Sequence, residues 1–285
     1  TDTKTYDGTE KTVTGYTVTN ISNKNYKDTD FTFNGNAEAT GTDADTYNMG
    51  LTAAQFTNKN TNFSSVKFVV TDGKLTINKC PILITAKDFT TVYNGKSPVI
   101  EDYTILRLDS NEEYVNGLPT DHKIDSYVTC GSGVDAGVYE QFSMDEAKIV
   151  DAKGKDVTSN YDISYEDGKL EITPRKVTLT SETASKVYDG TALTKPNVKV
   201  TGDGFVDGEG VTYNVTGTIT NVGETKNTFT YTLDEGTKAT NYTITKTEGK
   251  LEITPVTAKV TVTIKGNTDT KTYDGTEKTV TGYTV

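Results

Sequence analysis

The chain has 285 residues, 33% of them hydrophobic, and its 29 basic and 40 acidic side chains give a net charge of −11. This charge repels phosphate backbones and anionic headgroups, so nucleic acid and membranes are not expected as partners. No apolar run approaches the roughly 18 residues of a membrane-spanning helix. Abundant threonine, 17 tyrosines and the lack of helix-period patterns predict an all-β chain with several small cores.

The chain repeats its own opening near its end. The stretch "TDTKTYDGTEKTVTGYTV" occupies residues 1–18 and returns letter for letter at residues 268–285. Self-similarity of this kind predicts repeated structural modules. We expect the sequence to be part of a tandem array, slightly longer than one period, with residue 1 inside a repeat and any export signal outside the sequence.

A Tyr-Asp-Gly or Tyr-Asn-Gly triplet marks the beginning of each module. It occurs four times, at Tyr6-Asp7-Gly8, Tyr93-Asn94-Gly95, Tyr188-Asp189-Gly190 and Tyr273-Asp274-Gly275. Asp-Gly and Asn-Gly pairs favour tight turns with a glycine at positive φ. We therefore expect a turn at each triplet.

A second landmark closes each module, at "DGKLTI" (72–77), "DGKLEI" (167–172) and "EGKLEI" (248–253), each preceded by an Asn-aromatic pair. In "NYDISYEDGKLEI" (160–172), apolar residues alternate with polar ones on both sides of Asp167-Gly168, which predicts a β-hairpin. Its apolar residues are expected to form one inner face of a sandwich.

Proline marks the joints between modules, in "INKCPILIT" (77–85), "ITPRKVTLT" (172–180) and "ITPVTAKVTVTI" (253–264). Such short joints are stiff, which favours an extended rod. The predicted fold is all-β, with tandem immunoglobulin-like β-sandwich modules. The predicted bounds are 1–80, 81–173 with an insertion near 107–127, 174–254, and 255–285 as the first strands of the next repeat.

The first module lacks its own first strand within this sequence. The equivalent strand is "AKVTVTIKG" at 258–266, which precedes the second copy of the opening eighteen residues. An open sheet edge at one end and a spare strand at the other are what strand addition between molecules requires.

The Tyr-Asp-Gly triplet, the Asn-Tyr pair and the Gly-Lys-Leu-x-Ile-Thr-Pro ending resemble the MBG and YDG families of bacterial surface repeats. "KVYDGTALT" (186–194) is closest to the pattern, and "TVYNGKSPVI" (91–100) departs from it most. The resemblance implies immunoglobulin-type sandwiches in large secreted or wall-anchored proteins, often adhesins, where they serve mainly as stalk. It implies an extracellular location at the bacterial cell surface or cell wall, and it carries over no catalytic residue.

The candidates for chemistry are few. His122, the single histidine, lies in the polar insertion, where we expect a solvated loop residue rather than a metal ligand or a triad member. Cys80 and Cys130 are the only cysteines. They form either a disulfide that staples the joint to the second module or two separate thiols, and neither has a partner at zinc-ligand spacing.

Three acidic clusters, "GTDADTYN", "DSNEEY" and "GDGFVDGEG", are interpreted as solvated turns rather than calcium sites, because none has the spacing of a calcium loop. Asn160 and Asn241 are expected to bond backbone before their strands, with a crosslink to Lys176 or Lys259 as the less favoured alternative. Tyr103, Tyr114 and Tyr127 are the candidates for a sugar-stacking surface, although strand positions are their default interpretation.

No recurring acid, base and nucleophile is present, so we expect no enzyme and no cofactor. The main hypothesis is a structural stalk or spacer repeat of a bacterial adhesin or fibre, whose partners are neighbouring repeats of the same protein. Two alternatives stay open at this point. The chain either assembles head to tail with other copies by strand complementation, or its second module binds a glycan or host protein through the insertion.

Overall fold

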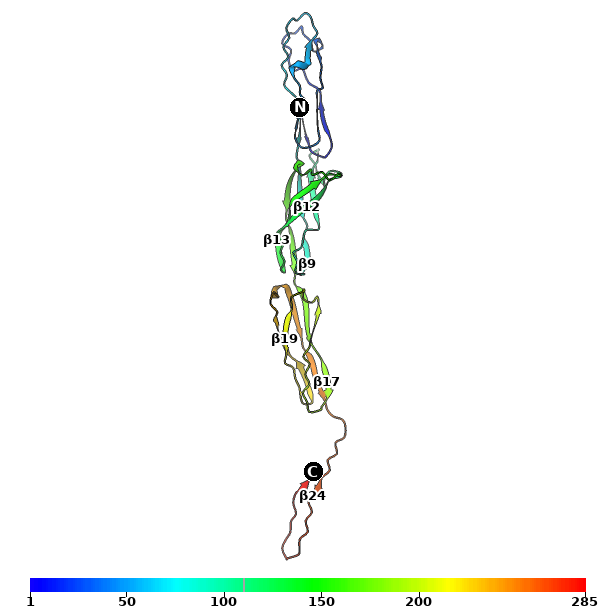
Figure 1. Ribbon diagram of the computed structural model, residues 1–285, viewed down its shortest axis with the longest axis vertical. Helices are drawn as coiled ribbons and strands as arrows, with labels where there is room; N and C mark the ends of the chain where they lie inside the picture. Colours follow the sequence, from blue (N-terminus) through cyan, green and yellow to red (C-terminus); the bar gives the residue numbers. More distant parts are fainter. Residues whose placement is uncertain (110) are drawn as a thin grey trace. The chain divides into compact units, whose positions relative to one another are not determined.

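The computed structural model describes residues 1–109 and 111–285 and contains β-strands joined by loops and short 3-10 turns (Figure 1). The all-β prediction is confirmed. The chain divides into two compact units, Thr1–Arg175 and Lys176–Val285. The strands group by sequence into a first module (residues 1–79), a second module (80–173) and a third module (175–254), followed by a C-terminal segment (255–285).

The first module has three small sheets, with strand orders β1-β7-β5, β2-β4 and β3-β6. Their bounds are β1 Asp2–Thr5, β2 Lys11–Thr14, β3 Phe31–Phe33, β4 Glu38–Gly41, β5 Thr46–Asn48, β6 Phe56–Asn58 and β7 Lys74–Asn78. Leu75 and Ile77 of β7 are buried, as the alternation in "GKLTI" predicts. The closing strand of this module therefore contributes its alternate residues to the core.

The second module is a sandwich of two four-stranded sheets, β11-β10-β8-β14 and β12-β13-β15-β9. The bounds are β8 Cys80–Ala86, β9 Phe89–Val92, β10 Tyr103–Leu108, β11 Tyr114–Asn116, β12 Lys123–Cys130, β13 Gly137–Val150, β14 Tyr161–Glu166 and β15 Gly168–Thr173. Buried Ile82 and Ile84 of one sheet and Phe142 and Leu170 of the other form the core. The insertion supplies β11 as an extra edge strand beside β10.

The third module repeats this arrangement with sheets β18-β16-β22, β17-β23-β20 and β19-β21. The bounds are β16 Arg175–Ser181, β17 Ala184–Val187, β18 Val198–Gly202, β19 Val211–Val215, β20 Gly223–Asn227, β21 Phe229–Leu233, β22 Tyr242–Thr247 and β23 Gly249–Thr254. Leu179, Phe229 and Leu251 are fully buried. In the second and third modules the first strand thus lies in the middle of a sheet.

The closing hairpin predicted for each module is wrong. β14 pairs with β8, whereas β15 pairs with β13 and β9, so a single residue, Asp167, carries the chain from one sheet to the other. A Cβ on Gly168 would lie 2.7 Å from the carbonyl oxygen of Ala86. The glycine is therefore needed for close backbone approach at this crossing and not for a hairpin turn.

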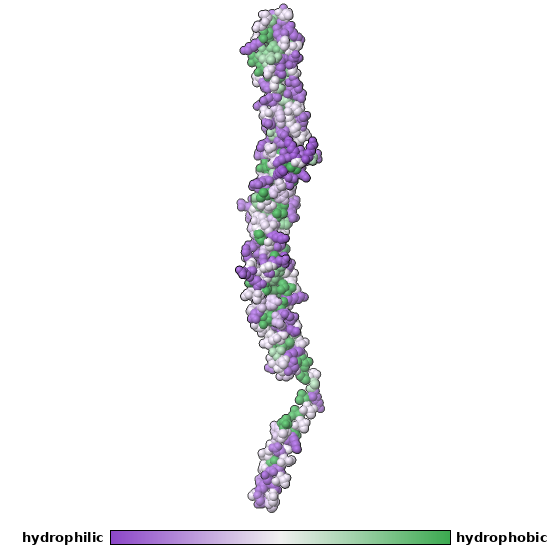
Figure 2. Space-filling view, viewed as in Figure 1, coloured by the Kyte–Doolittle hydropathy of each residue, from purple (hydrophilic) through white to green (hydrophobic). Residues whose placement is uncertain are grey.

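The C-terminal segment carries only a two-residue pair, β24 (Lys265–Gly266) with β25 (Tyr283–Thr284). The residues before it, 255–264, belong to no strand, although their apolar residues alternate. Figure 2 shows hydrophobic colour along this segment. Among the residues described, the structure has no helix long and apolar enough to cross a membrane.

Candidate functional site

The four triplets fold into the same local turn. Their glycines have φ of 81° at Gly8, 74° at Gly95, 78° at Gly190 and 76° at Gly275. In each turn the Asp or Asn side chain accepts a hydrogen bond from the backbone amide two residues later, at 2.9–3.0 Å. This is the conformation that Asp-Gly and Asn-Gly pairs favour.

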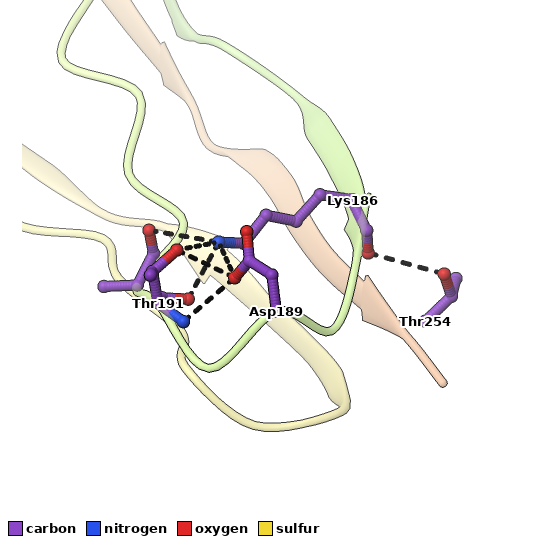
Figure 3. Close-up of polar contacts among 5 residues, drawn as sticks. Lys186, Asp189, Thr191 and Thr254 are labelled. Atoms are coloured by element: carbon purple, nitrogen blue, oxygen red, sulfur yellow. Dashed lines mark hydrogen bonds and ion pairs between the residues drawn. The ribbon is translucent and has the colours of Figure 1, made fainter. Parts of the chain in front are cut away.

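A lysine ammonium reinforces the turn in the third module (Figure 3). Lys186 Nζ donates to Asp189 Oδ1 at 2.8 Å and to the hydroxyl of Thr191 at 2.7 Å. The bond from Lys186, together with those from Thr191, holds the pKa of the Asp189 carboxyl well below its usual range. Because these groups are near the surface, the bonds fix the shape of the turn more than they stabilise the fold.

The first triplet also lies at the joint between the first and second modules. Only Lys79 separates β7 from β8, so the two modules share almost no linker. Tyr6 is 3% exposed, packs edge-on against Tyr161 with ring centroids 5.4 Å apart, and stacks on His122 at 5.9 Å. The Nδ1 atom of His122 lies 2.5 Å from the hydroxyl oxygen of Tyr161. One aromatic ring of the first module is thus enclosed by two rings of the second.

Gly8 allows this packing. A Cβ at Gly8 would lie 3.0 Å from two atoms of the His122 ring, in addition to the strain of a positive φ. Gly190 and Gly275 have the same φ sign, but nothing lies within 4 Å of their Cβ positions. The glycine of the triplet therefore permits the positive φ of the turn in every module, and at Gly8 it also leaves room for the His122 ring.

Asn160 makes the polar contact of the joint. It is buried, its Oδ1 accepts a hydrogen bond from the Ala44 amide at 2.8 Å, and its Nδ2 donates to Asp43 Oδ1 at 2.9 Å. Lys155 Nζ lies 3.1 Å from the other oxygen of Asp43. Asn160 was expected to bond backbone before its own strand, but it bonds a loop of the preceding module.

The joint shifts the pKa values of its groups. The hydrogen bonds from Asn160 and Lys155 lower the pKa of Asp43, so this carboxylate stays charged at neutral pH. Burial raises the pKa of Tyr6 and Tyr161, so both hydroxyls stay protonated. Burial lowers the pKa of His122 against the opposing fields of Asp151 and Asp121, which favours the neutral imidazole. The joint is therefore assembled from neutral rings and from two polar contacts to the charged Asp43 carboxylate, one from Asn160 and one from Lys155.

Comparison with known families identifies two of the modules. Residues 1–79 match the MBG domain and residues 173–249 match the YDG domain. The chain carries an MBG domain and a YDG domain. Neither match covers residues 80–172. No curated protein and no solved structure matches the chain.

His122 lies in a loop, as expected, but the expectation that it is solvated is wrong. His122 is half-buried against the MBG domain, through its contacts with Tyr6 and Gly8. A lone histidine in a polar stretch gives no sequence signal of this contact. Asp43, classed with the acidic turns, likewise acts at the joint.

The two cysteines are not brought together. Both are free, with Cys80 buried at the start of β8 and Cys130 at the end of β12. Cys80 is paired with Tyr161 at the joint, whereas Cys130 lies eight residues beyond His122, roughly 25 Å along a strand. A disulfide needs Cα atoms within about 7 Å, so this placement leaves two thiols.

The acidic clusters make internal bonds. Asp203 accepts a bond from the Lys176 amide at 2.8 Å, Glu209 accepts one from the Tyr242 hydroxyl at 2.7 Å, and Asp109 accepts one from the Glu113 amide at 2.9 Å. Among the described residues, no group of three or more His, Cys, Asp or Glu side chains is placed to hold a metal ion.

The tyrosines of the insertion do not gather on one surface. Tyr103 and Tyr127 pack edge-on with centroids 6.2 Å apart, and the Tyr127 hydroxyl donates to the Ile100 carbonyl. Tyr114 is exposed at the far end of the β10–β11 pair, opposite Leu108. Since Tyr103 begins β10 and Leu108 ends it, the third ring is separated from the other two by about 16 Å of strand.

Proposed function

We propose that this chain is a spacer: a run of repeat modules in a bacterial cell-surface protein that holds a binding region away from the cell. The observation that carries the proposal is the joint between the MBG domain and the second module. A one-residue connection there is combined with enclosure of Tyr6 and the buried Asn160 bonds. Such a joint limits reorientation of neighbouring modules, which is what a spacer needs in order to keep its length.

Three further observations support the proposal. The MBG and YDG matches are to repeat-type domains, and the opening eighteen residues recur at 268–285. The acidic surface favours solubility and not adhesion to anionic surfaces. We also propose that the chain is not an enzyme, because its sequence has no recurring acid, base and nucleophile.

Scattering tests the spacer role. Small-angle X-ray scattering would compare chains holding one, two and three copies of residues 1–267. A spacer predicts that the maximum dimension rises linearly, by roughly 30 Å or more for each module. A dimension that grows only slowly with copy number would show modules folded onto one another and would overturn the proposal.

Location needs a second measurement. Antibodies against the chain should label intact cells of the source bacterium and should stop doing so after surface protease treatment. Labelling only of lysed cells would contradict the extracellular location.

A further inference from the structure

The triplet of the second module differs chemically from the other three. Those three contain aspartate, whereas the second module has Asn94-Gly95. In an Asn-Gly pair the backbone nitrogen of the glycine can attack the side-chain carbonyl carbon, because glycine has no Cβ to hinder the approach. An ionised aspartate resists the same attack, since its carbonyl carbon is electron-rich and an oxide is a poor leaving group. Asn94 is therefore the reactive member of the set.

A lysine ammonium protects the Asp triplets further. It binds the carboxylate of each one, in the pairs Lys11–Asp7, Lys186–Asp189 and Lys278–Asp274. In the last two pairs the bond from the lysine lowers the pKa of the carboxyl, which keeps the group ionised at neutral pH. In the second module Pro98 stands at the place of Lys11. Thr91 stands at the place of Lys186, so neither position supplies an ammonium.

The turn holds the Asn94 side chain in position for the attack. Its Oδ1 accepts a hydrogen bond from the Lys96 amide at 2.9 Å, which keeps the side-chain carbonyl beside the Gly95 peptide and draws electron density from the carbonyl carbon. Asn94 and Gly95 are both exposed, so water reaches the turn. The turn itself is anchored, because the Tyr93 amide donates to the Thr173 carbonyl at 2.9 Å.

Two other Asn-Gly pairs provide an internal comparison. Asn34 and Asn116 are also exposed, so access to water does not distinguish the three sites. The Gly117 amide, which would have to attack Asn116, donates instead to the Ile105 carbonyl at 2.8 Å. The Asn34 amide donates to the Gln55 carbonyl, and within the described residues its side chain makes no hydrogen bond that would position it. Only the Asn94 side chain is thus held against the peptide that attacks it.

We propose that Asn94 is a site of spontaneous modification, at which the side chain converts to aspartate and isoaspartate through a succinimide. The Gly95 nitrogen forms a bond to Asn94 Cγ, the bond from Cγ to Nδ2 breaks, and the proton of the Gly95 amide leaves with Nδ2 as ammonia. Water then opens the ring at either carbonyl. Cleavage of the new bond gives aspartate, and cleavage of the original peptide bond gives isoaspartate. This inference does not depend on the spacer role.

The two products alter the turn differently. Aspartate gives the second module the triplet of the other modules, with one added negative charge and no ammonium at the places of Thr91 and Pro98. Isoaspartate routes the main chain through the former side chain and lengthens it by a methylene group. This insertion lies next to Tyr93, which is 3% exposed and whose carbonyl accepts a bond from Arg175 Nη1 at 3.3 Å. We expect isoaspartate to weaken that bond and to loosen the turn.

Peptide mapping of the full chain tests the proposal. In the folded chain kept at pH 8, Asn94 should convert at least tenfold faster than Asn34 or Asn116, with aspartate and isoaspartate resolved by chromatography and identified by mass. Conversion should slow at pH 6, because the attacking nitrogen must lose its proton. In urea the three pairs should convert at similar rates, since the sequence around each glycine is then the only difference between them.

Asn94→Gln is the matched control, because it keeps an amide at this position but closes a ring far more slowly. It should stay unmodified at position 94 while Asn34 and Asn116 convert as in the parent. Equal rates at the three sites of the folded chain would overturn the proposal. It would also be overturned if Asn94 converted more slowly in the folded chain than in urea, because the turn would then protect the side chain instead of positioning it.

Discussion

The MBG turn and the turn at the end of the chain have the same sequence but different surroundings. Tyr6 is 3% exposed, whereas Tyr273, in the same eighteen letters, is 90% exposed, and Tyr188 of the YDG domain is 42% exposed. The glycine φ values agree within a few degrees and the Asp side chain makes the same bond in all three turns. The turn is therefore a local property of the sequence, whereas the burial of Tyr6 depends on the rings of His122 and Tyr161 in the second module.

Removing the tyrosine ring should give the largest difference in stability between the buried turn at Tyr6 and the exposed turn at Tyr273. Tyr6→Ala deletes a ring enclosed by His122 and Tyr161, and we expect it to destabilise the MBG domain and its joint by about 3 kcal/mol. Tyr273→Ala should change stability by less than about 0.5 kcal/mol. Urea unfolding followed by residue-resolved hydrogen exchange measures both, and equal effects would show that the joint contributes little.

Replacing the triplet glycines with alanine should also destabilise the joint turn more than a turn away from the joint, but the difference in stability should be smaller than for the tyrosines. Gly190→Ala incurs only the cost of positive φ, about 1 kcal/mol, because nothing lies near its Cβ position. Gly8→Ala adds the approach to His122 at 3.0 Å, so it should cost more and should also loosen the joint. The comparison of the two melting profiles is the measurement, and a smaller loss for Gly8→Ala would contradict the packing described for the joint.

Acidification should produce the smallest loss of stability, and this loss should be confined to the joint. The pKa of His122 is lowered from 6.5 in the folded state by burial, despite Asp121 and Asp151, so the unfolded state binds its proton first. Joint stability is therefore complete above pH 6.5 and falls as the pH drops through that value. Exchange of the Ala44 amide should accelerate between pH 7 and pH 5.5 after correction for the intrinsic rate. His122→Phe should abolish this component, and its persistence would assign it to another group.

The sequence predicts well whatever depends on neighbouring residues. The positive φ at Gly8 and the alternation at Leu75 and Ile77 both follow from local rules of turn and strand chemistry.

Contacts between distant segments could not be predicted in the same way. Asp167-Gly168 has the composition of a hairpin turn, but close approach to Ala86 places the two strands in different sheets. Asn160 and Asp43 meet across a joint, and His122 reaches it from an irregular insertion, so no period or spacing links them. A single sequence contains the residues of the joint, but nothing in it indicates which of them contact one another.

The parallel pairing of β8 with β14 has a mechanical consequence. β8 enters the second module at the joint with the MBG domain, and β15 leaves the module at Thr173, after a crossing at Asp167. Tension between these two points would pull β15 past its parallel partner β9 and, through Asp167, β14 past its parallel partner β8, in both cases along the length of the strands. The ladder from Cys80–Tyr161 to Thr85–Glu166 would then be strained all at once instead of opening one pair at a time. A module threaded in this way resists stretching in shear, the geometry in which many weak hydrogen bonds share one force.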